Sequence, residues 1–340
     1  MIIFLTSFIL IIFLVNFFLK KNLILLNDTG FNHQSFTSLK KVPLSGGIFI
    51  LYFFFYNFKS FDLNFLIYLS IFFLIGLFGD INIIKSPSKR FFLQLIFIVI
   101  FIIDLNLDIN DLKIDFLNNL LNNYYFNIFF VSFCFLVFLN GTNFIDGNNC
   151  LSLGYFVVIL FFLLNLIDNQ IIIFEKNFLY EFFIAIVVLL IFNFFNKVYL
   201  GDNGIYLITI FIGYLLVDIY VKNPNLSPYF IANLLWYPSF EIFFSVFRKF
   251  LYKKSPMKPD TSHLHQLFYS FLLKKVRINK EIVNSLTGLI INFYHLLIFF
   301  ISINYTYDSK IQLTCIFISI CVYTFCYLLL SKNKKLLSKK

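Results

Sequence analysis

The chain has 340 residues, of which 60% are hydrophobic and 13% charged, and its mean hydropathy is +0.86. Soluble domains carry about 25% charged residues, so this composition excludes an ordinary soluble domain and predicts a polytopic membrane protein. The net charge of +10 does not indicate a nucleic-acid partner, because the basic residues are scattered between apolar segments. Five cysteines without a CxxC spacing indicate neither disulfides nor a metal cluster.

Eleven apolar runs of roughly 15 to 20 residues can serve as spans of a bilayer. They lie at about residues 2–19, 44–57, 64–79, 91–105, 125–141, 151–167, 178–196, 204–221, 228–247, 286–304 and 310–331. We therefore predict an all-α integral membrane protein with about eleven transmembrane helices. Since no fixed-period repeat or flexible linker separates them, residues 1–340 are predicted to form a single domain.

The orientation follows from the positive charges. No cation precedes the first apolar run, whereas Lys20 and Lys21 follow it, so this run is predicted to remain as a span with its N-terminus outside. The C-terminus is then cytoplasmic. Only five of the 27 lysines and arginines fall outside: Lys59, Lys113, Lys176, Lys222 and Lys310. This asymmetry supports the orientation, and it places five polar clusters on the cytoplasmic side.

The first cluster, residues 28–47, contains His33, Lys40, Lys41 and the pair Gly46-Gly47. An ordinary basic loop explains the charges equally well. The two glycines indicate a close helix contact or a break at the start of the second span.

The second cluster joins Asp80, at the end of the third span, to Lys89 and Arg90, at the start of the fourth. A carboxylate suits a magnesium ion or a proton, and the two cations suit phosphate. The alternative is a helix cap at Asp80 with interfacial anchoring by the cations.

The third and fourth clusters each contain a carboxylate. Asn143 and Asp146 are three residues apart and would share a face of a helical turn, where their oxygens suit a hard cation or a nucleotide. The alternative is a simple Asn-Asp-Gly turn. Asp202 lies between Gly201 and Gly204, which would let a ligand approach the backbone, although an N-cap by Asp202 is the alternative.

The fifth cluster is the basic loop from 248 to 280, with Asp260, His263 and His265. The two histidines suit a diphosphate or a metal. Zinc is not indicated, because no third strong ligand follows at the expected spacing. The alternative is a pair of surface histidines.

Taken in order, these clusters resemble the polyprenyl-phosphate N-acetylhexosamine-1-phosphate transferases of glycosyltransferase family 4, membrane enzymes that begin bacterial cell-surface glycans. The resemblance covers about residues 28–270. The family motifs Pro-x-x-Gly-Gly, Asp-Asp, Asn-x-x-Asp-Gly, Gly-Asp-x-Gly and Pro-Asp-x-x-His-x-His correspond to Pro43–Gly47, Gly79-Asp80, Asn143–Gly147, Gly201–Gly204 and Pro259–His265.

This resemblance implies transfer of a sugar 1-phosphate from a UDP-N-acetylhexosamine to undecaprenyl phosphate at the cytoplasmic face of the bacterial inner membrane. It implies that Asp80 and Asp202 are catalytic, and that Asp202 and Asn143 hold Mg²⁺, with Mn²⁺ as an alternative. The implied substrate contacts are Lys89, Arg90, Asn143, Asp146, Asn149, His263 and His265. A homodimer is left open.

The chain departs from the family pattern at four positions. Gly79 replaces the first aspartate of the pair, and Asn149, Cys150 and Gln266 replace an acidic residue, a glycine and a histidine. The loss at Gly79 keeps open a catalytically silent homologue that acts as a scaffold. A phospho-muramoyl-pentapeptide transferase is less well matched, because its histidines form a contiguous run. A transporter is less well matched, because its charges are expected near the bilayer midplane in paired halves.

Overall fold

The computed structural model describes residues 2–26, 41–172, 174, 176–253, 255 and 260–337. The expectations for His33, Lys40 and Pro259 fall outside these residues. The helices are α1 (Ile2–Asn22), α2 (Gly46–Tyr56), η1 (Phe58–Ser60), α3 (Leu63–Asp80), α4 (Pro87–Asp104), α5 (Asp115–Leu121), α6 (Tyr124–Ile145), α7 (Leu151–Asp168), α8 (Lys176–Phe194), α9 (Gly201–Lys222), α10 (Pro228–Leu251), α11 (Leu264–Lys275), α12 (Lys280–Ser302), η2 (Ile303–Tyr305) and α13 (Ser309–Leu337).

The all-α prediction is confirmed for the described residues, where the only β-type pairing is an isolated bridge between Leu26 and Pro43. A helix occupies each of the eleven expected spans. Among the described helices, nine are long and apolar enough to cross a membrane. Of the other two expected spans, α2 has only 11 residues and α4 carries three charged side chains within 18 residues. The chain is thus a multi-pass membrane protein, whereas the count of eleven spans and the sides of the termini stay predictions.

Local sequence explains several helix starts. Ser86 and Ser227 each precede a proline at the first position of α4 and α10, where proline has no amide hydrogen to leave unpaired. The side chains of Asn123 and Asn279 accept hydrogen bonds from the first turns of α6 and α12. These caps end the polar connections and begin the apolar helices.

Helix α9 forms the centre of the bundle, with 83% of its apolar stretch buried, and α2, α3 and α6 pack around it. Glycines allow the closest approaches. A Cβ at Gly47 would lie 2.6 Å from the backbone nitrogen of Gly204, and a Cβ at Gly76 would lie 2.4 Å from the carbonyl oxygen of Asp202. The close helix contact predicted at Gly46-Gly47 is therefore confirmed, and it is a contact with the start of α9.

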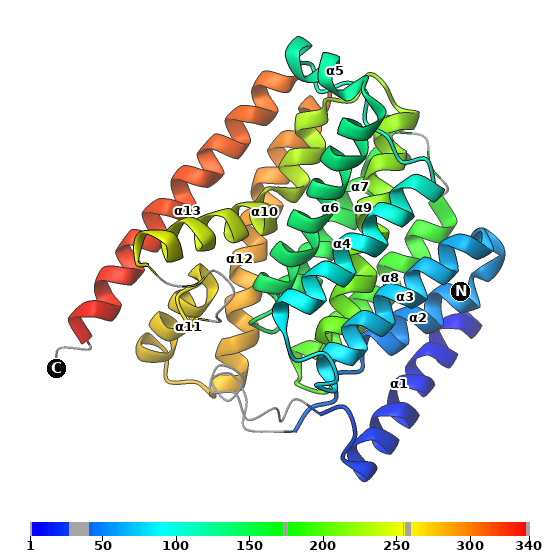
Figure 1. The fold of residues 1–340 in the computed structure, drawn as a ribbon. Coiled ribbons are helices and arrows are strands. Elements are labelled where there is room, and N and C mark those ends of the chain that lie inside the picture. Colours follow the sequence, from blue (N-terminus) through cyan, green and yellow to red (C-terminus); the bar gives the residue numbers. More distant parts are fainter. Residues whose placement is uncertain are drawn as a thin grey trace.

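Helices α5 and α11 lie at opposite ends of the bundle, and α1 and α13 lie on opposite sides of it (Figure 1). Helix α10 bends along its length in the same view, and Pro238 lies inside it. A proline within a helix removes one backbone hydrogen bond and produces such a bend. The bend turns the second half of α10 toward α13 and the loop that precedes α11.

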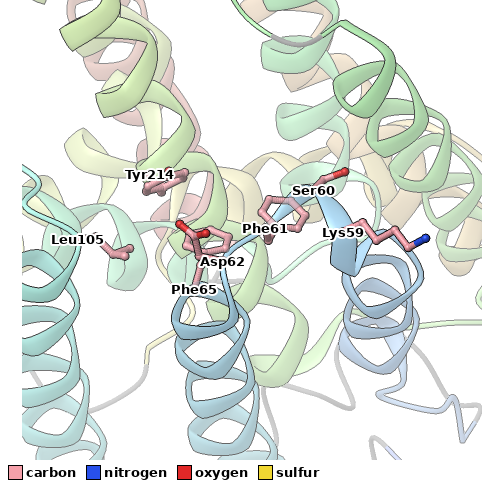
Figure 2. A pocket seen from close by; sticks show the side chains of 7 residues that line it. All are labelled: Lys59, Ser60, Phe61, Asp62, Phe65, Leu105 and Tyr214. Carbon is pink, nitrogen blue, oxygen red and sulfur yellow. The ribbon is translucent and has the colours of Figure 1, made fainter.

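A cavity of about 230 Å³ lies at the α5 end, between the start of α3, the end of α4 and the middle of α9. Figure 2 shows Asp62, Phe65 and Tyr214 close together in it, with Lys59 directed away from them. None of the site residues predicted from the sequence lines this cavity. Asp80, Arg90 and Asp202 lie at the other end of the same three helices.

Candidate functional site

The ends of four helices meet at one end of the bundle, and residues from the other three contact Asp202. The Arg90 guanidinium at the start of α4 forms an ion pair with Oδ2 of Asp202 at the start of α9. Asn143 near the end of α6 donates a hydrogen bond of 2.7 Å to Oδ1 of Asp202. The Arg90 and Asp202 side chains are 26% and 22% exposed, so a ligand can reach this ion pair.

Asp80, at the end of α3, caps the start of α9. Its two carboxylate oxygens accept hydrogen bonds of 3.0 Å from the backbone nitrogens of Asp202 and Asn203, and the Asn203 side chain adds another. The first amides of a helix have no partner inside the helix, and they carry the positive end of its dipole. Asp80 therefore fixes the backbone that carries Asp202. The alternative interpretation of Asp80 was a helix cap. Asp80 does form a helix cap, and the helix that it caps is α9.

Gly79 faces the ion pair. A Cβ at this position would lie 3.1 Å from Nη1 of Arg90 and 3.1 Å from Oδ2 of Asp202. A side chain on residue 79 would thus enter the space that the Arg90 guanidinium occupies. In this chain residue 79 has no side chain, and the Arg90 guanidinium occupies the adjacent space and forms an ion pair with Asp202.

Asp146 follows α6 and is partly buried. Ser152 of α7 donates a hydrogen bond to its Oδ1. The pKa of Asp146 is raised to about 8, mainly by burial, while the nearby charges of Asp202 and Asp80 also raise it and the Ser152 hydrogen bond opposes them. Asp146 is therefore mostly protonated at neutral pH and can donate as well as accept a hydrogen bond.

We expect Asp146→Asn to be at least as stable as the unsubstituted protein above neutral pH. Because the folded state holds the Asp146 proton up to about pH 8, whereas the unfolded state releases it near the ordinary pKa of 3.8, the folded state loses stability as the pH rises between these values. Asparagine is neutral throughout and removes this loss. Thermal unfolding in detergent from about pH 5 to pH 8.5 measures the effect.

The control for this prediction is Asp260→Asn, because the shift has the opposite sign. Burial acts to raise the pKa of Asp260, but the hydrogen bond from Arg248 and the charges of His263 and Arg248 outweigh it and lower the pKa. Asp260 thus stabilises the fold at every pH above its ordinary value, and Asp260→Asn should lower the unfolding temperature throughout. An Asp146→Asn protein that is less stable than the unsubstituted protein above neutral pH would contradict the prediction.

Asn148 and Asn149 make contacts within the protein. Asn149 is buried and donates to the backbone oxygen of Asn193, in the last turn of α8, at 3.0 Å and to the side chain of Asn196, just after α8, at 2.7 Å. Asn148 donates to Asn284 of α12 at 2.6 Å. The structure thus uses Asn149 to join α7 to α8, and its predicted substrate contact stays a prediction.

The two histidines lie together beside the Asn140–Asn149 stretch. The rings of His263 and His265 stack at 5.5 Å, and a Cβ at Gly147 would lie 2.7 Å from Nε2 of His265. His265 is fully buried, which lowers its pKa to about 3, so the ring is neutral. These histidines are therefore not a surface pair, and their loop packs onto the Asp146 turn.

Residues on both sides of His263 and His265 organise the loop. Gln266, which replaces a histidine of the family pattern, accepts a hydrogen bond from the His263 backbone nitrogen at 3.3 Å and so completes a capping box at the start of α11. Arg248 forms an ion pair of 2.8 Å with Asp260. Lys89 is exposed, and no contact of its side chain with these clusters is found in the described part of the chain.

Sequence reasoning assigned no role to several members of the site. Asn203 and Ser152 hold Asp80 and Asp146, and Glu241 contacts His263 from inside α10. Glu241 has one sequence signal of a functional role, because it is a charged residue within an apolar helix. Asn203 and Ser152 are small polar residues at helix starts, which their neighbours in sequence do not distinguish.

The oxygen donors near Asp202 fit a magnesium ion. Mg²⁺ takes oxygen ligands, keeps several waters, and is bound through one or two carboxylates together with substrate phosphates. Asp202 offers a partly exposed carboxylate and Asn143 an amide oxygen. Within the described residues no group of three His, Cys, Asp or Glu side chains is arranged to hold a metal ion. An ion at Asp202 would therefore share this carboxylate with Arg90.

The fold and the site together define a multi-pass membrane protein with a partly exposed cluster of carboxylates, amides and one guanidinium at a common end of its helices. Residues 63–220 match the family described as glycosyl transferase family 4. No curated protein matches the chain. The match supports a membrane sugar-phosphate transferase as the general kind of function. The matched region contains Asp80, Arg90, Asn143, Asp146 and Asp202.

Proposed function

We propose that the chain transfers N-acetylhexosamine 1-phosphate from a UDP-sugar to undecaprenyl phosphate and releases UMP, as the first membrane step of a cell-surface glycan pathway. One observation carries the proposal. Four residues from four helices converge on one partly exposed ion pair, and all lie within the region matched to glycosyl transferase family 4: Asp80, Arg90, Asn143 and Asp202.

In this reaction an oxygen of the lipid phosphate forms a bond to the β-phosphorus of the UDP-sugar. The bond between that phosphorus and the bridging oxygen breaks, and its electron pair leaves with UMP. A phosphate monoester is already an anion at neutral pH, since its second pKa is about 6, so little base catalysis is required. Phosphoryl transfer depends mainly on positioning and on neutralising charge.

Each residue of the site has its own proposed role in this reaction. Arg90 would donate hydrogen bonds to the diphosphate while Asp202 holds its guanidinium in place. Asp80 would position Asp202 through the start of α9, or orient the lipid phosphate as the family resemblance implies. Asp146 would contact the nucleotide, and His263 and His265 would lie beside the diphosphate. Magnesium, held by Asp202 with Asn143, would supply further neutralisation of phosphate charge.

The proposed location is the bacterial inner membrane with the site on the cytoplasmic face. The positive-inside rule supports it, because 22 of the 27 lysines and arginines are predicted to lie on the same side as the site. UDP-sugars are made in the cytoplasm, so a site on that face meets its donor directly.

The test is release of UMP. We expect purified protein, incubated with undecaprenyl phosphate, magnesium and a panel of UDP-sugars, to release UMP with at least one UDP-N-acetylhexosamine and to release none when the lipid is omitted. A preparation that releases no UMP with any donor, while a related transferase is active alongside, would overturn the proposal and favour the silent scaffold.

A further inference from the structure

Glu241 is a buried carboxylate with no role in the proposed reaction. It lies in α10, one turn beyond Pro238, and is only 1% exposed. Removing a charged group from water costs several kcal/mol unless partners satisfy it. The partners that it has therefore indicate what the chain uses it for.

Both oxygens of Glu241 are engaged, and by two different parts of the chain. Oε1 lies 2.8 Å from Nδ1 of His263, in the loop before α11, and the Tyr323 hydroxyl of α13 donates to Oε2 at 2.7 Å. Since a carboxylate only accepts hydrogen bonds, Nδ1 of His263 must carry the hydrogen. On the other side of the ring, Nε2 of His263 lies 3.4 Å from Asp260.

We infer that Glu241 and Tyr323 are positioning residues for His263, and that they make the C-terminal helix α13 part of the support for the candidate site. Tyr323 fixes the carboxylate, and the carboxylate fixes the orientation and the Nδ1 hydrogen of the imidazole. Residues 63–220, which match the family, contain neither residue. The effect on turnover rests on the proposed function, but the state of the imidazole does not.

The ring of Tyr323 also packs among aromatic side chains, so the test must separate packing from the hydrogen bond. Its centroid lies 5.0 Å from that of Phe240 and 5.2 Å from that of Phe244. Tyr327, one turn on, stacks with Tyr323 at 6.4 Å and packs on Phe244 at 4.7 Å. No side-chain hydrogen bond of Tyr327 is found among the described residues. Tyr327→Phe is therefore a matched control for Tyr323→Phe.

The first experiment is nitrogen-15 NMR of histidine side chains in the full chain, with the His263 signals assigned by loss in His263→Asn. We expect Glu241→Gln to shift the Nδ1 signal of His263, Tyr323→Phe to shift it less, and Tyr327→Phe to leave it in place. An unchanged signal in a folded Glu241→Gln protein would overturn the inference. If that variant does not fold, equal spectra for Tyr323→Phe and Tyr327→Phe would overturn it.

The second experiment measures turnover in the same variants. A carboxylate that orients a functional histidine is worth about 10- to 100-fold in activity, so Glu241→Gln should lower kcat by this amount. Tyr323→Phe removes a hydrogen bond to this carboxylate but leaves the carboxylate in place, so it should lower kcat by less than Glu241→Gln does, and Tyr327→Phe should not lower it. Adding Tyr323→Phe to Glu241→Gln should cause little further loss, because the two act through one group.

The outcomes distinguish the two proposals. If no protein releases UMP but the His263 signal shifts as expected, the proposed function fails and the positioning by Glu241 stands. If UMP is released equally by Tyr323→Phe and Tyr327→Phe with equal His263 spectra, the function stands and the positioning fails.

Discussion

Asp202→Asn is expected to lower the rate of UMP release by about 100-fold or more, the usual cost of removing a group that stabilises charge in a transition state. Asparagine keeps the shape of the side chain, and the backbone amide of residue 202 can still bond to Asp80. The substitution removes the negative charge that holds Arg90 and would hold a magnesium ion. The measurement is turnover of purified protein at saturating donor and lipid.

Asp218→Asn is the matched control, because Asp218 lies on the same helix α9 at its other end. Its 2.8 Å ion pair with Lys222 joins residues four apart, and the Lys222 side chain is 56% exposed. Such a pair contributes about 0–1 kcal/mol, so the control should keep normal turnover and nearly normal stability. Asp202→Asn with the turnover of Asp218→Asn would contradict the role given to Asp202.

Gly76→Ala is expected to lower the unfolding temperature strongly and to remove activity with it. A Cβ at residue 76 would lie 2.4 Å from the backbone oxygen of Asp202 and 2.5 Å from two backbone atoms of Asn203. Backbone atoms cannot rotate away, so α3 must retreat from α9, which costs about 1–3 kcal/mol or more. The same movement withdraws Asp80 from the amides that it caps.

Gly79→Ala is the control, because it lies one turn along the same helix and gains the same helix propensity. Its new Cβ would meet only the flexible ends of Arg90 and Asp202, at 3.1 Å. We expect thermal unfolding in detergent to separate the two variants, with Gly79→Ala close to the unsubstituted protein. Equal unfolding temperatures would show that the α3–α9 contact is not as tight as described.

The Gly79 position illustrates what could not be predicted from motifs. Compared with the family pattern, Gly79 is simply a missing carboxylate. In the structure the space beside it holds the Arg90 guanidinium, which neutralises Asp202. The sequence placed Arg90 and Asp202 at helix ends on one side of the membrane, but the 111 residues between them carry no signal of their pairing.

Asn149 shows the reverse case. The family resemblance implied a substrate contact for Asn149, which stays a prediction, and in the structure the amide bonds to Asn193 and Asn196. A buried amide requires partners, and whether these come from a ligand or from another helix depends on which helix lies next to it. Local sequence does not contain that information.

The sequence by itself determined the class of the protein, the positions of eleven of its helices and the helix ends at which polar residues collect. These features depend on the length of apolar runs and on the placement of charges, which are properties of short segments of chain. Only the tertiary structure decided that Asp80 caps α9, that Arg90 rather than a second carboxylate lies on Asp202, and that Glu241 joins α13 to His263. Each of these depends on contacts between residues distant in sequence, and such contacts exist only once the helices have packed.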